Sequence, residues 1–297
     1  MKIAVSSYSF QPLFREGKIT QLDTVARAAE MGFDGIEFTD LRPRGDGAPT
    51  TLDEQLAYAA EIRAEAEHRG IAIVGYMLVS CLYNGDAEKD AAEVERLCGQ
   101  IRVAAALGAP LVRHDVCYSE KIGGRTVSFE RMLPTIAANV RAVTAYAETL
   151  GIRTCIENHG VIVQESDRVE KLYNAVAHDN YGILIDIGNF LDADADPVSS
   201  TARLAPYAIH AHVKDLYIYP YGTPVPAGSA PVFTSRACNR LVPCPVGEGD
   251  VAVKQCLTIL KAAGYDGWLT VEYEGEDSAE GTVRCLENLR KILGELI

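Results

Sequence analysis

The chain contains eight short apolar runs, each followed by a segment with helical character or by a loop that leads to one. The runs are nearly continuous in apolar residues, which is typical of strands buried on both faces of a parallel sheet. Eight strand–helix units in one series favour a closed (β/α)8 barrel over an open sheet. The predicted strands are Lys2–Ser7, Gly35–Phe38, Ile71–Met77, Pro110–Val116, Ile152–Glu157, Gly182–Ile187, Ala208–Val213 and Trp268–Tyr273.

The segments between the runs carry helix start and stop signals. Thr51-Leu-Asp-Glu54 resembles a capping box, and glycines such as Gly32, Gly70 and Gly108 follow the last residue of a helical pattern. An open dinucleotide-binding sheet would require Gly-x-Gly-x-x-Gly after the first strand, and the sequence has no such motif there. We therefore expect one TIM barrel domain, of the α/β class, over residues 1–297.

The composition of the chain gives more information about its possible functions than about its fold. The formal net charge of −13 argues against a protein that follows a phosphate backbone, so no nucleic-acid partner is expected. The N-terminus lacks the features of a signal peptide, and no run is long enough to span a membrane. The eight cysteines form no Cys-x-x-Cys pair, and most are expected to be reduced. These features predict a cytoplasmic protein without a membrane partner.

Polar residues of the types that commonly bind metals lie at the ends of the last four predicted strands. Because a parallel barrel gathers the carboxyl ends of its strands at one mouth, these side chains should converge. Strand side chains alternate, so residues two positions apart share a face. The candidates are Glu157 and His159 on the fifth strand, Asp186 on the sixth, His210, His212 and Lys214 on the seventh, and Glu272 and Glu274 on the eighth.

One carboxylate from each of the fifth, sixth and eighth strands, together with an imidazole from the seventh, predicts a metal site. Without compensation, carboxylates in one pocket repel one another, and one of them is forced to hold a proton. A divalent cation removes that cost. Three carboxylates with one imidazole suit a fairly hard ion, Mn²⁺ or Mg²⁺ first, with Co²⁺ or Zn²⁺ as alternatives.

The segment at about 216–246 interrupts the regular series of strands and helices. It contains six of the thirteen prolines together with several tyrosines and two arginines. It follows the seventh predicted strand, on the face where barrel active sites lie. A long loop there could close over a ligand or contact another protomer.

Four motifs carry a resemblance to a known family: Glu157-Asn-His, Asp186-x-Gly-Asn, His210-x-His-x-Lys-Asp and Glu272-Tyr. With them, the chain resembles the sugar phosphate isomerase/epimerase superfamily of xylose isomerase-like TIM barrels over essentially its whole length. That group includes ketose 3-epimerases, hydroxypyruvate isomerase, inosose dehydratase and an AP-endonuclease branch. The resemblance implies a metal-dependent enzyme with a small carbohydrate substrate, and homo-oligomers are common in the group.

The resemblance also implies roles for individual residues. It favours His212 over His210 and Glu272 over Glu274, so the implied metal ligands are Glu157, Asp186, His212 and Glu272. In the epimerases and isomerases of the group, two glutamates flank the substrate carbon. Catalysis would then proceed by enediolate-type proton transfer between Glu157 and Glu272. The residues expected to contact the substrate are His114, His159, Asn189, Lys214 and Glu37.

Two other members of the superfamily are alternatives to an isomerase or epimerase. A dehydratase of a keto-cyclitol or keto-sugar shares the opening proton removal and then expels a hydroxyl, with His114 or His159 as the candidate acid. The endonuclease branch is disfavoured, because Asn189 stands where that branch has a histidine. Several sugar epimerases also have histidine there, so Asn189 departs from the ketohexose type of site.

Overall fold

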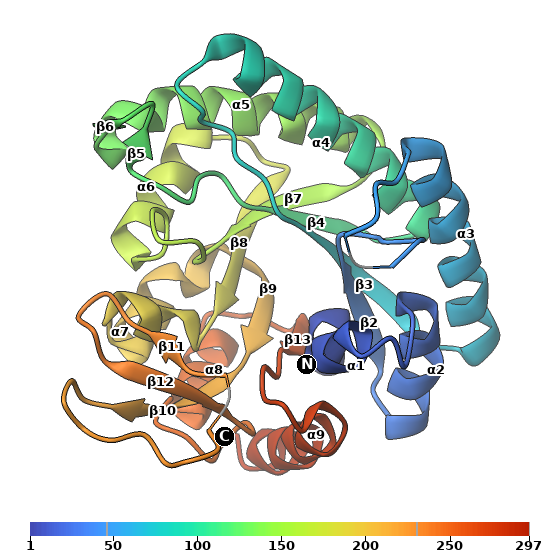
Figure 1. Ribbon diagram of the computed structural model, residues 1–297, viewed down its shortest axis with the longest axis vertical. Coiled ribbons are helices and arrows are strands. Elements are labelled where there is room, and N and C mark those ends of the chain that lie inside the picture. Colours follow the sequence, from blue (N-terminus) through green and yellow to red (C-terminus); the bar gives the residue numbers. More distant parts are fainter. Residues whose placement is uncertain (46, 230, 297) are drawn as a thin grey trace.

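The computed structural model describes residues 1–45, 47–229 and 231–296. Eight parallel strands close into a barrel in the order β1-β13-β9-β8-β7-β4-β3-β2 (Figure 1). The TIM barrel predicted from the sequence is confirmed. The barrel strands are β1 (Lys2–Ser6), β2 (Gly35–Thr39), β3 (Ala72–Leu78), β4 (Leu111–His114), β7 (Arg153–Glu157), β8 (Tyr181–Asp186), β9 (Ala208–Val213) and β13 (Trp268–Val271).

Helices form the outer layer of the barrel (Figure 1). Among the described residues, no helix is both long enough and apolar enough to cross a membrane. The α-helices are α1 (Gln11–Arg15), α2 (Gln21–Met31), α3 (Leu52–Arg69), α4 (Ala87–Leu107), α5 (Phe129–Thr149), α6 (Ser166–Val176), α7 (Pro197–Leu204), α8 (Val253–Ala262) and α9 (Ser278–Gly294). Short 3-10 helices are η1 (Ser7–Phe10), η2 (Asn189–Ala193) and η3 (Ala205–Tyr207).

Local sequence signals set the helix boundaries. The Thr51 side chain accepts from the backbone N–H of Glu54, and the Glu54 side chain accepts from the backbone N–H of Thr51, which completes the expected capping box. Gly70 ends the same helix at φ 69°, in the left-handed region that favours glycine. Helix α4 ends in the same way at Gly108, with φ 79°. The next strand begins within a few residues of each of these caps.

The apolar core has two parts. A small cluster inside the barrel consists of Met77, Leu111, Cys155 and Leu184, with Ile209 packed against it. The larger cluster lies between the strands and the surrounding helices. Apolar packing therefore fills the interior beneath the carboxyl ends of the strands, where the polar side chains begin.

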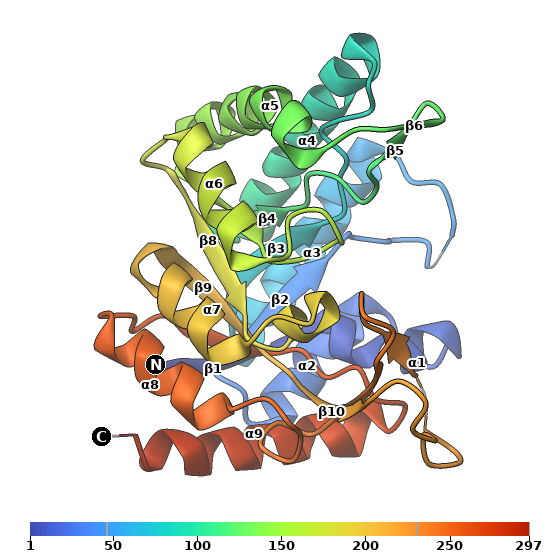
Figure 2. The ribbon, with the colours of Figure 1, turned by 90° about the vertical axis from the view of Figure 1, so that its left-hand side faces the viewer.

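The segment after β9 forms a small antiparallel sheet in the order β10-β12-β11 (Figure 1; β10 is also labelled in Figure 2). Its strands are β10 (Asp215–Tyr219), β11 (Phe233–Thr234) and β12 (Arg240–Cys244), while a short hairpin of β5 (Lys121–Ile122) and β6 (Arg125–Thr126) follows β4. The Asp215 carboxylate accepts backbone N–H groups from Gly247, Gly249 and Val251 at 2.9–3.0 Å. This carboxylate ties the end of the inserted sheet to the start of the last βα unit.

Candidate metal centre and active site

Four buried side chains meet at the carboxyl ends of neighbouring strands. Glu157 ends β7, Asp186 ends β8, His212 lies near the end of β9, and Glu272 directly follows β13. One potential ligand atom from each lies within 4.8 Å of the others. All four side chains are buried, with Glu272 the most exposed at 7 %. The structure thus brings together the four residues that the sequence suggested as metal ligands.

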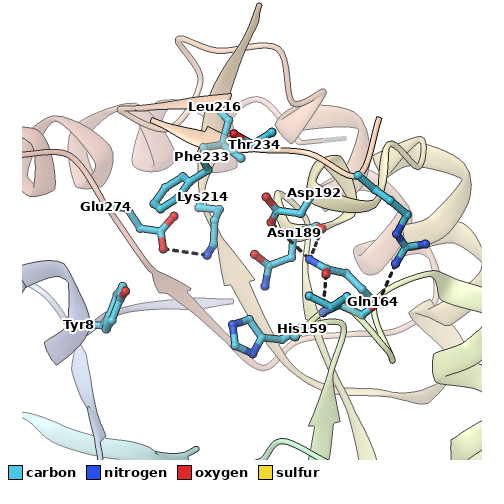
Figure 3. Close-up of a pocket in the computed structure, with 13 residues that line it drawn as sticks. Tyr8, His159, Gln164, Asn189, Asp192, Lys214, Leu216, Phe233, Thr234 and Glu274 are labelled. Carbon is cyan, nitrogen blue, oxygen red and sulfur yellow. Dashed lines mark hydrogen bonds and ion pairs between the residues drawn. The ribbon is translucent and has the colours of Figure 1, made fainter. Parts of the chain in front are cut away.

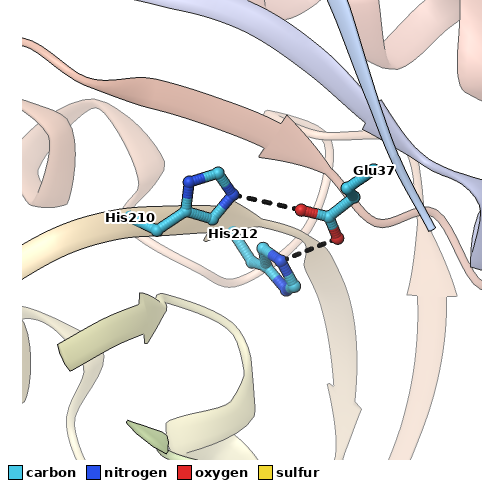
Figure 4. Close-up of side chains that lie close together, drawn as sticks. All are labelled: Glu37, His210 and His212. Carbon is cyan, nitrogen blue, oxygen red and sulfur yellow. Dashed lines mark hydrogen bonds and ion pairs between the residues drawn. The ribbon is translucent and has the colours of Figure 1, made fainter. Parts of the chain in front are cut away.

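The Glu37 carboxylate contacts the imidazole of His212 on the side opposite to the other candidate ligands. Nε2 of His212 lies 2.9 Å from Oε1 of Glu37, and Nε2 of His210 lies 3.1 Å from the other Glu37 oxygen (Figure 4). Burial opposes ionisation of Glu37, but His212 and His210 hold its pKa well below the usual range. A carboxylate close to one imidazole nitrogen favours a proton on that nitrogen and leaves the other nitrogen to bind a metal.

The remaining nitrogen of His212 faces the carboxylates. Nδ1 lies 3.4 Å from Glu157 Oε1, 3.8 Å from Glu272 Oε2 and 3.9 Å from Asp186 Oδ2. Among the described residues, neither ring nitrogen of His212 has a hydrogen-bond partner, and the 2.9 Å approach of Nε2 to Glu37 is an ion-pair contact. Ligands bonded at about 2.1 Å to one ion lie roughly 3–4 Å from each other, so these separations suit a shared cation. The donor set and its spacing therefore fit a divalent metal ion.

Two basic side chains also reach the carboxylates. Lys214 Nζ lies 2.6 Å from Glu272 Oε2 and 3.2 Å from Asp186 Oδ2. Burial, together with repulsion from Glu157 and Glu272, raises the pKa of Asp186 to about 6 despite the attraction of Lys214. Burial also opposes ionisation of Glu157, but Arg113 and His212 outweigh it and hold the Glu157 pKa well below its usual range.

Arg113 and Asp115 belong to the site although the sequence analysis did not name them. Nε of Arg113 lies 2.9 Å from Glu157 Oε2, and Nη1 donates to Asp115 at 2.9 Å. Asp115 also contacts Nδ1 of His159 at 2.9 Å and accepts from the Tyr118 hydroxyl. Alternation along β4 places Arg113 on the same face as Leu111, but the sequence alone does not show that this face points into the barrel.

His114 and Glu37 were expected to contact substrate, and neither lies against the main cavity. His114 is fully buried, and burial lowers the pKa of its imidazole to about 4. Its position has the parity of Val112, which packs in the core between strands and helices. Glu37 lies behind His212, where it contacts the two histidines of β9. The direction of each side chain from its strand explains both placements.

A cavity of about 450 Å³ opens at this mouth of the barrel (Figure 3). His159, Asn189 and Lys214, three of the residues expected to contact substrate, line it. Asn189 Nδ2 donates to Glu157 Oε1 at 2.9 Å, so this amide also orients a candidate metal ligand. Phe233, Thr234 and Arg236 of the inserted segment add further lining. The segment at 216–246 therefore helps to build the wall of the cavity.

His159 provides a cationic group on the cavity wall. Its side chain is 37 % exposed, and its ring meets Tyr118 edge-on with centroids 6.1 Å apart. Burial of the ring disfavours the charged form, but Asp115 outweighs it and raises the pKa of His159 to about 9. A protonated imidazole at this position can donate a hydrogen bond or a proton to an oxygen in the cavity.

The protein is a closed β/α barrel, and a buried cluster of three carboxylates and one histidine lies at the carboxyl ends of its strands. Residues 25–292 match the sequence model of the xylose isomerase-like TIM barrel family. The chain belongs to this family, and the resemblance drawn from the four motifs is confirmed.

Curated relatives match part of the chain. The rhizopine catabolism protein MocC of Rhizobium meliloti is 28 % identical over 207 residues, which cover 65 % of this chain and 60 % of MocC. An inosose dehydratase of Clostridium beijerinckii is 22 % identical over 161 residues, covering 54 % of this chain and 53 % of that protein. The chain thus matches little more than half the length of these relatives.

Solved structures share the fold over nearly the whole chain. The IolI protein with a bound zinc atom has a TM-score of 0.76 at 16 % identity and covers 100 % of this chain and 99 % of its own. The probable 3-DHS dehydratase AsbF from Bacillus anthracis has a TM-score of 0.72 at 18 % identity, over 98 % and 99 %. D-allulose 3-epimerase from Methylomonas sp. has a TM-score of 0.71 at 15 % identity, over 98 % of both chains. Proteins described as an epimerase and as a probable dehydratase thus share this fold.

Proposed function

We propose that the protein is a divalent-metal-dependent isomerase or epimerase of a sugar or sugar-like α-hydroxyketone. The observation that carries the proposal is the strand order β13-β9-β8-β7, which places Glu272 and Glu157 on either side of Asp186 and His212. A substrate at this cluster meets a carboxylate from each side. Removing a proton from one face of a carbon and returning it to the other requires two bases arranged in this way.

In the proposed reaction, one of the two glutamates accepts the proton from the carbon next to the carbonyl, and the bonding electrons form an enediolate. For epimerisation, the second glutamate starts protonated and donates its proton to the opposite face of that carbon. For isomerisation, a glutamate returns the proton to the neighbouring carbon while the hydroxyl proton moves to the former carbonyl oxygen. A divalent cation at the cluster supplies Lewis acidity, which stabilises negative charge on the substrate oxygens. Arg113 favours the ionised form of Glu157, the form that accepts a proton, and Lys214 contacts the Glu272 carboxylate at 2.6 Å.

Three side chains on the cavity wall are the proposed substrate contacts. Lys214 and His159 present cationic donors, and Asn189 presents an amide that already contacts Glu157. Donors arranged around a carbohydrate bind its hydroxyls and carbonyl and fix which carbon faces the bases. The proposed partner is therefore a small polar carbohydrate held by hydrogen bonds.

The test is solvent exchange on metal-loaded protein. The protein is reconstituted with Mn²⁺ under anaerobic conditions and incubated in D₂O with ketoses, ketose phosphates and ketocyclitols, and the products are analysed by NMR and mass spectrometry. We expect metal-dependent deuterium incorporation at a single carbon. Glu157→Gln should lower the exchange rate by about 100-fold or more, whereas Glu61→Gln, on the exposed surface of α3, should leave it unchanged. Near-normal exchange by a Glu157→Gln protein that retains metal would contradict the role of this base.

Mn²⁺ is the proposed native ion, because three carboxylates and one imidazole form a hard donor set. Mg²⁺, Co²⁺ and Zn²⁺ remain candidates for the same ligands. Competition dialysis of metal-free protein against equal concentrations of the four ions, followed by elemental analysis, ranks them. Preferential retention of another ion would replace Mn²⁺ in the proposal without changing the ligands.

A dehydratase is the second candidate function, and the His159–Asp115 contact favours it. A protonated His159 could donate its proton to a hydroxyl that leaves after the same opening proton removal. The relatives described as inosose dehydratases support this alternative. A product lighter by one water, with formation slowed by His159→Gln, would assign this reaction. Deuterium exchange without water loss would favour the isomerase or epimerase.

A further inference from the structure

A second hollow adjoins the main cavity on the side away from His159. Its volume is about 290 Å³, and it shares the walls Tyr8, Phe233 and Glu274 with the cavity of about 450 Å³. Lys214 and Asn189, which contact the candidate metal ligands, also line that cavity. These three side chains stand together on one side of the site in Figure 3. The site can therefore hold a ligand that is larger than one that contacts only the candidate metal ligands.

The second hollow is built from segments that follow four barrel strands. Tyr8 and Arg15 come after β1, Arg42 after β2, Phe233 after β9, and Glu274 after β13. These segments therefore all lie at the carboxyl ends of the strands, on the same face as the metal cluster. Phe233 belongs to the inserted sheet, which supplies the wall common to both spaces.

The charged groups lining this hollow are two arginines and one glutamate. Arg15 is exposed and lies 3.9 Å from Glu276, a weak contact. Arg42 is half-buried. The carboxylate of Glu274 points toward Lys214, with 3.6 Å between Oε1 and Nζ (Figure 3). Two guanidinium groups, those of Arg15 and Arg42, thus line this hollow beside one carboxylate, in a chain of net charge −13.

We propose that this second hollow binds an anionic substituent, a carboxylate or a phosphate, carried by the substrate whose α-hydroxyketone occupies the metal cluster. The inference rests on the proposed function, because it names the substrate class of that site. Guanidinium groups match the planar oxygen pairs of carboxylates and phosphates and can bind them in bidentate fashion. Tyr8 and Phe233 offer apolar surface to the carbon chain that connects the two ends of the ligand.

The experiment compares four probes that share one α-hydroxyketone. D-Fructose is neutral, D-fructuronate carries a carboxylate at C6, D-fructose 6-phosphate carries a phosphate there, and lactulose carries a second, neutral sugar ring. Dissociation constants are measured by calorimetry on the Mn²⁺-loaded protein, and deuterium exchange is followed separately. We expect at least one anionic probe to bind about 10-fold or more tightly than fructose, the effect of a charge-assisted hydrogen bond.

The arginines are tested by the double variant Arg15→Gln/Arg42→Gln. It should remove the preference for the anionic probe and leave the dissociation constant of fructose and the metal content unchanged. Arg141→Gln/Arg153→Gln removes the same charge at exposed positions on α5 and β7 and should keep the preference. If the double variant fails to fold, Arg15→Gln alone, at an exposed position on α1, should reduce the preference in part.

Several outcomes would overturn the inference. Equal binding of all four probes, no detectable binding of either anion at millimolar concentration, tightest binding by lactulose, or an anion preference that survives Arg15→Gln/Arg42→Gln would each do so. The carboxylate and phosphate arms decide which anion the hollow accepts. Failure of the proposed reaction gives a different result: an arginine-dependent anion preference with no deuterium exchange from any probe would reject the chemistry and retain the binding site.

Discussion

His212 connects two layers of carboxylates at the centre of the site. Its Nε2 contacts Glu37, and its Nδ1 faces Glu157, Asp186 and Glu272. The first contact fixes the ring, and the second presents a free nitrogen to the cluster. Glu37 is therefore a positioning residue for the proposed metal, although it does not line the cavity.

Glu37→Gln should weaken metal binding by about 10- to 100-fold, because a ligand histidine loses the carboxylate that orients it and increases its basicity. The measurement is the Mn²⁺ dissociation constant, obtained by electron paramagnetic resonance of the free ion. Glu287→Gln, at an exposed position on α9, is the control and should bind as the unmodified protein does. An unchanged dissociation constant for Glu37→Gln would show that the imidazole is held without this contact.

Arg113 is the residue whose loss should most disturb the metal-free protein. It is 6 % exposed and forms ion pairs with the buried carboxylates of Glu157 and Asp115. Arg113→Met should lower the free energy of unfolding by about 3–5 kcal/mol, because it leaves buried charge uncompensated. Saturating Mn²⁺ should recover part of this loss, since a cation near Glu157 replaces some of the missing positive charge.

Urea unfolding of Arg113→Met with and without Mn²⁺ checks this expectation, and Arg102→Met, exposed on α4, provides the comparison. An equal loss in both variants would mean that the ion pairs contribute no more than the packing of a long side chain. If Mn²⁺ does not restore any of the unfolding free energy lost in Arg113→Met, the bound ion does not compensate the charge of Glu157.

At the scale of elements, the sequence predicted strands and caps well and predicted side-chain direction less well. The eight barrel strands lie within the predicted regions or differ by a few residues at their ends. In β4, however, Arg113 faces the interior and His114 the helices, so the residue of the more familiar catalytic type lies outside the site. To predict the directions of Arg113 and His114, one must know that Leu111 faces the barrel interior, and only the assembled barrel shows this.

The link between the inserted sheet and the last βα unit has no space for a side chain at Gly249. A Cβ there would lie 2.6 Å from Cys244 Sγ and 2.7 Å from the Leu216 carbonyl oxygen, and it would also clash with Asp215. We expect Gly249→Ala to destabilise the protein by about 1–3 kcal/mol through overpacking. Urea unfolding measures the change.

Gly99→Ala is the matched substitution in the interior of α4, where a Cβ makes only ordinary contacts with Leu52. It should stabilise the protein by up to about 1 kcal/mol, because alanine is the better helix former. If Gly249→Ala were equally harmless, the inserted sheet would be free to move away from the barrel, and its contribution to the cavity wall would need another explanation.

At the scale of the whole molecule, the proposed ion joins four strands that are distant in sequence. A ligand that binds only the folded chain stabilises it by mass action, by about 2.7 kcal/mol at 100 times the dissociation constant. Mn²⁺ should therefore raise the midpoint of thermal unfolding by on the order of 5 °C, and a chelator should reverse the rise. Differential scanning calorimetry makes the measurement.

The matched variant for this experiment is Asp186→Asn, which removes one candidate ligand charge without changing the size of the side chain. The rise should shrink or disappear in that protein, while potassium at the same ionic strength should produce none in either. A rise of the same size in Asp186→Asn would mean that Mn²⁺ stabilises the fold at some other place.

Local patterns in the sequence were sufficient to predict the barrel and the strand ends from which the site is built. Apolar runs, helix caps and alternation are local patterns, and each is set by residues within about one turn or one pleat of each other. They were enough to place Glu157, Asp186, His212 and Glu272 at the same mouth, and a family resemblance selected these four from their polar neighbours.

The surroundings of those four residues depend on contacts that form when the barrel folds. The contacts of Arg113 with Glu157, of Glu37 with His212, and of Phe233 with both cavities join segments that no local pattern relates. Their distances depend on how the strands are staggered as the sheet closes and on where the inserted sheet packs. These are properties of the closed barrel as a whole, which is why the ligands could be named from the sequence and their supporting contacts could not.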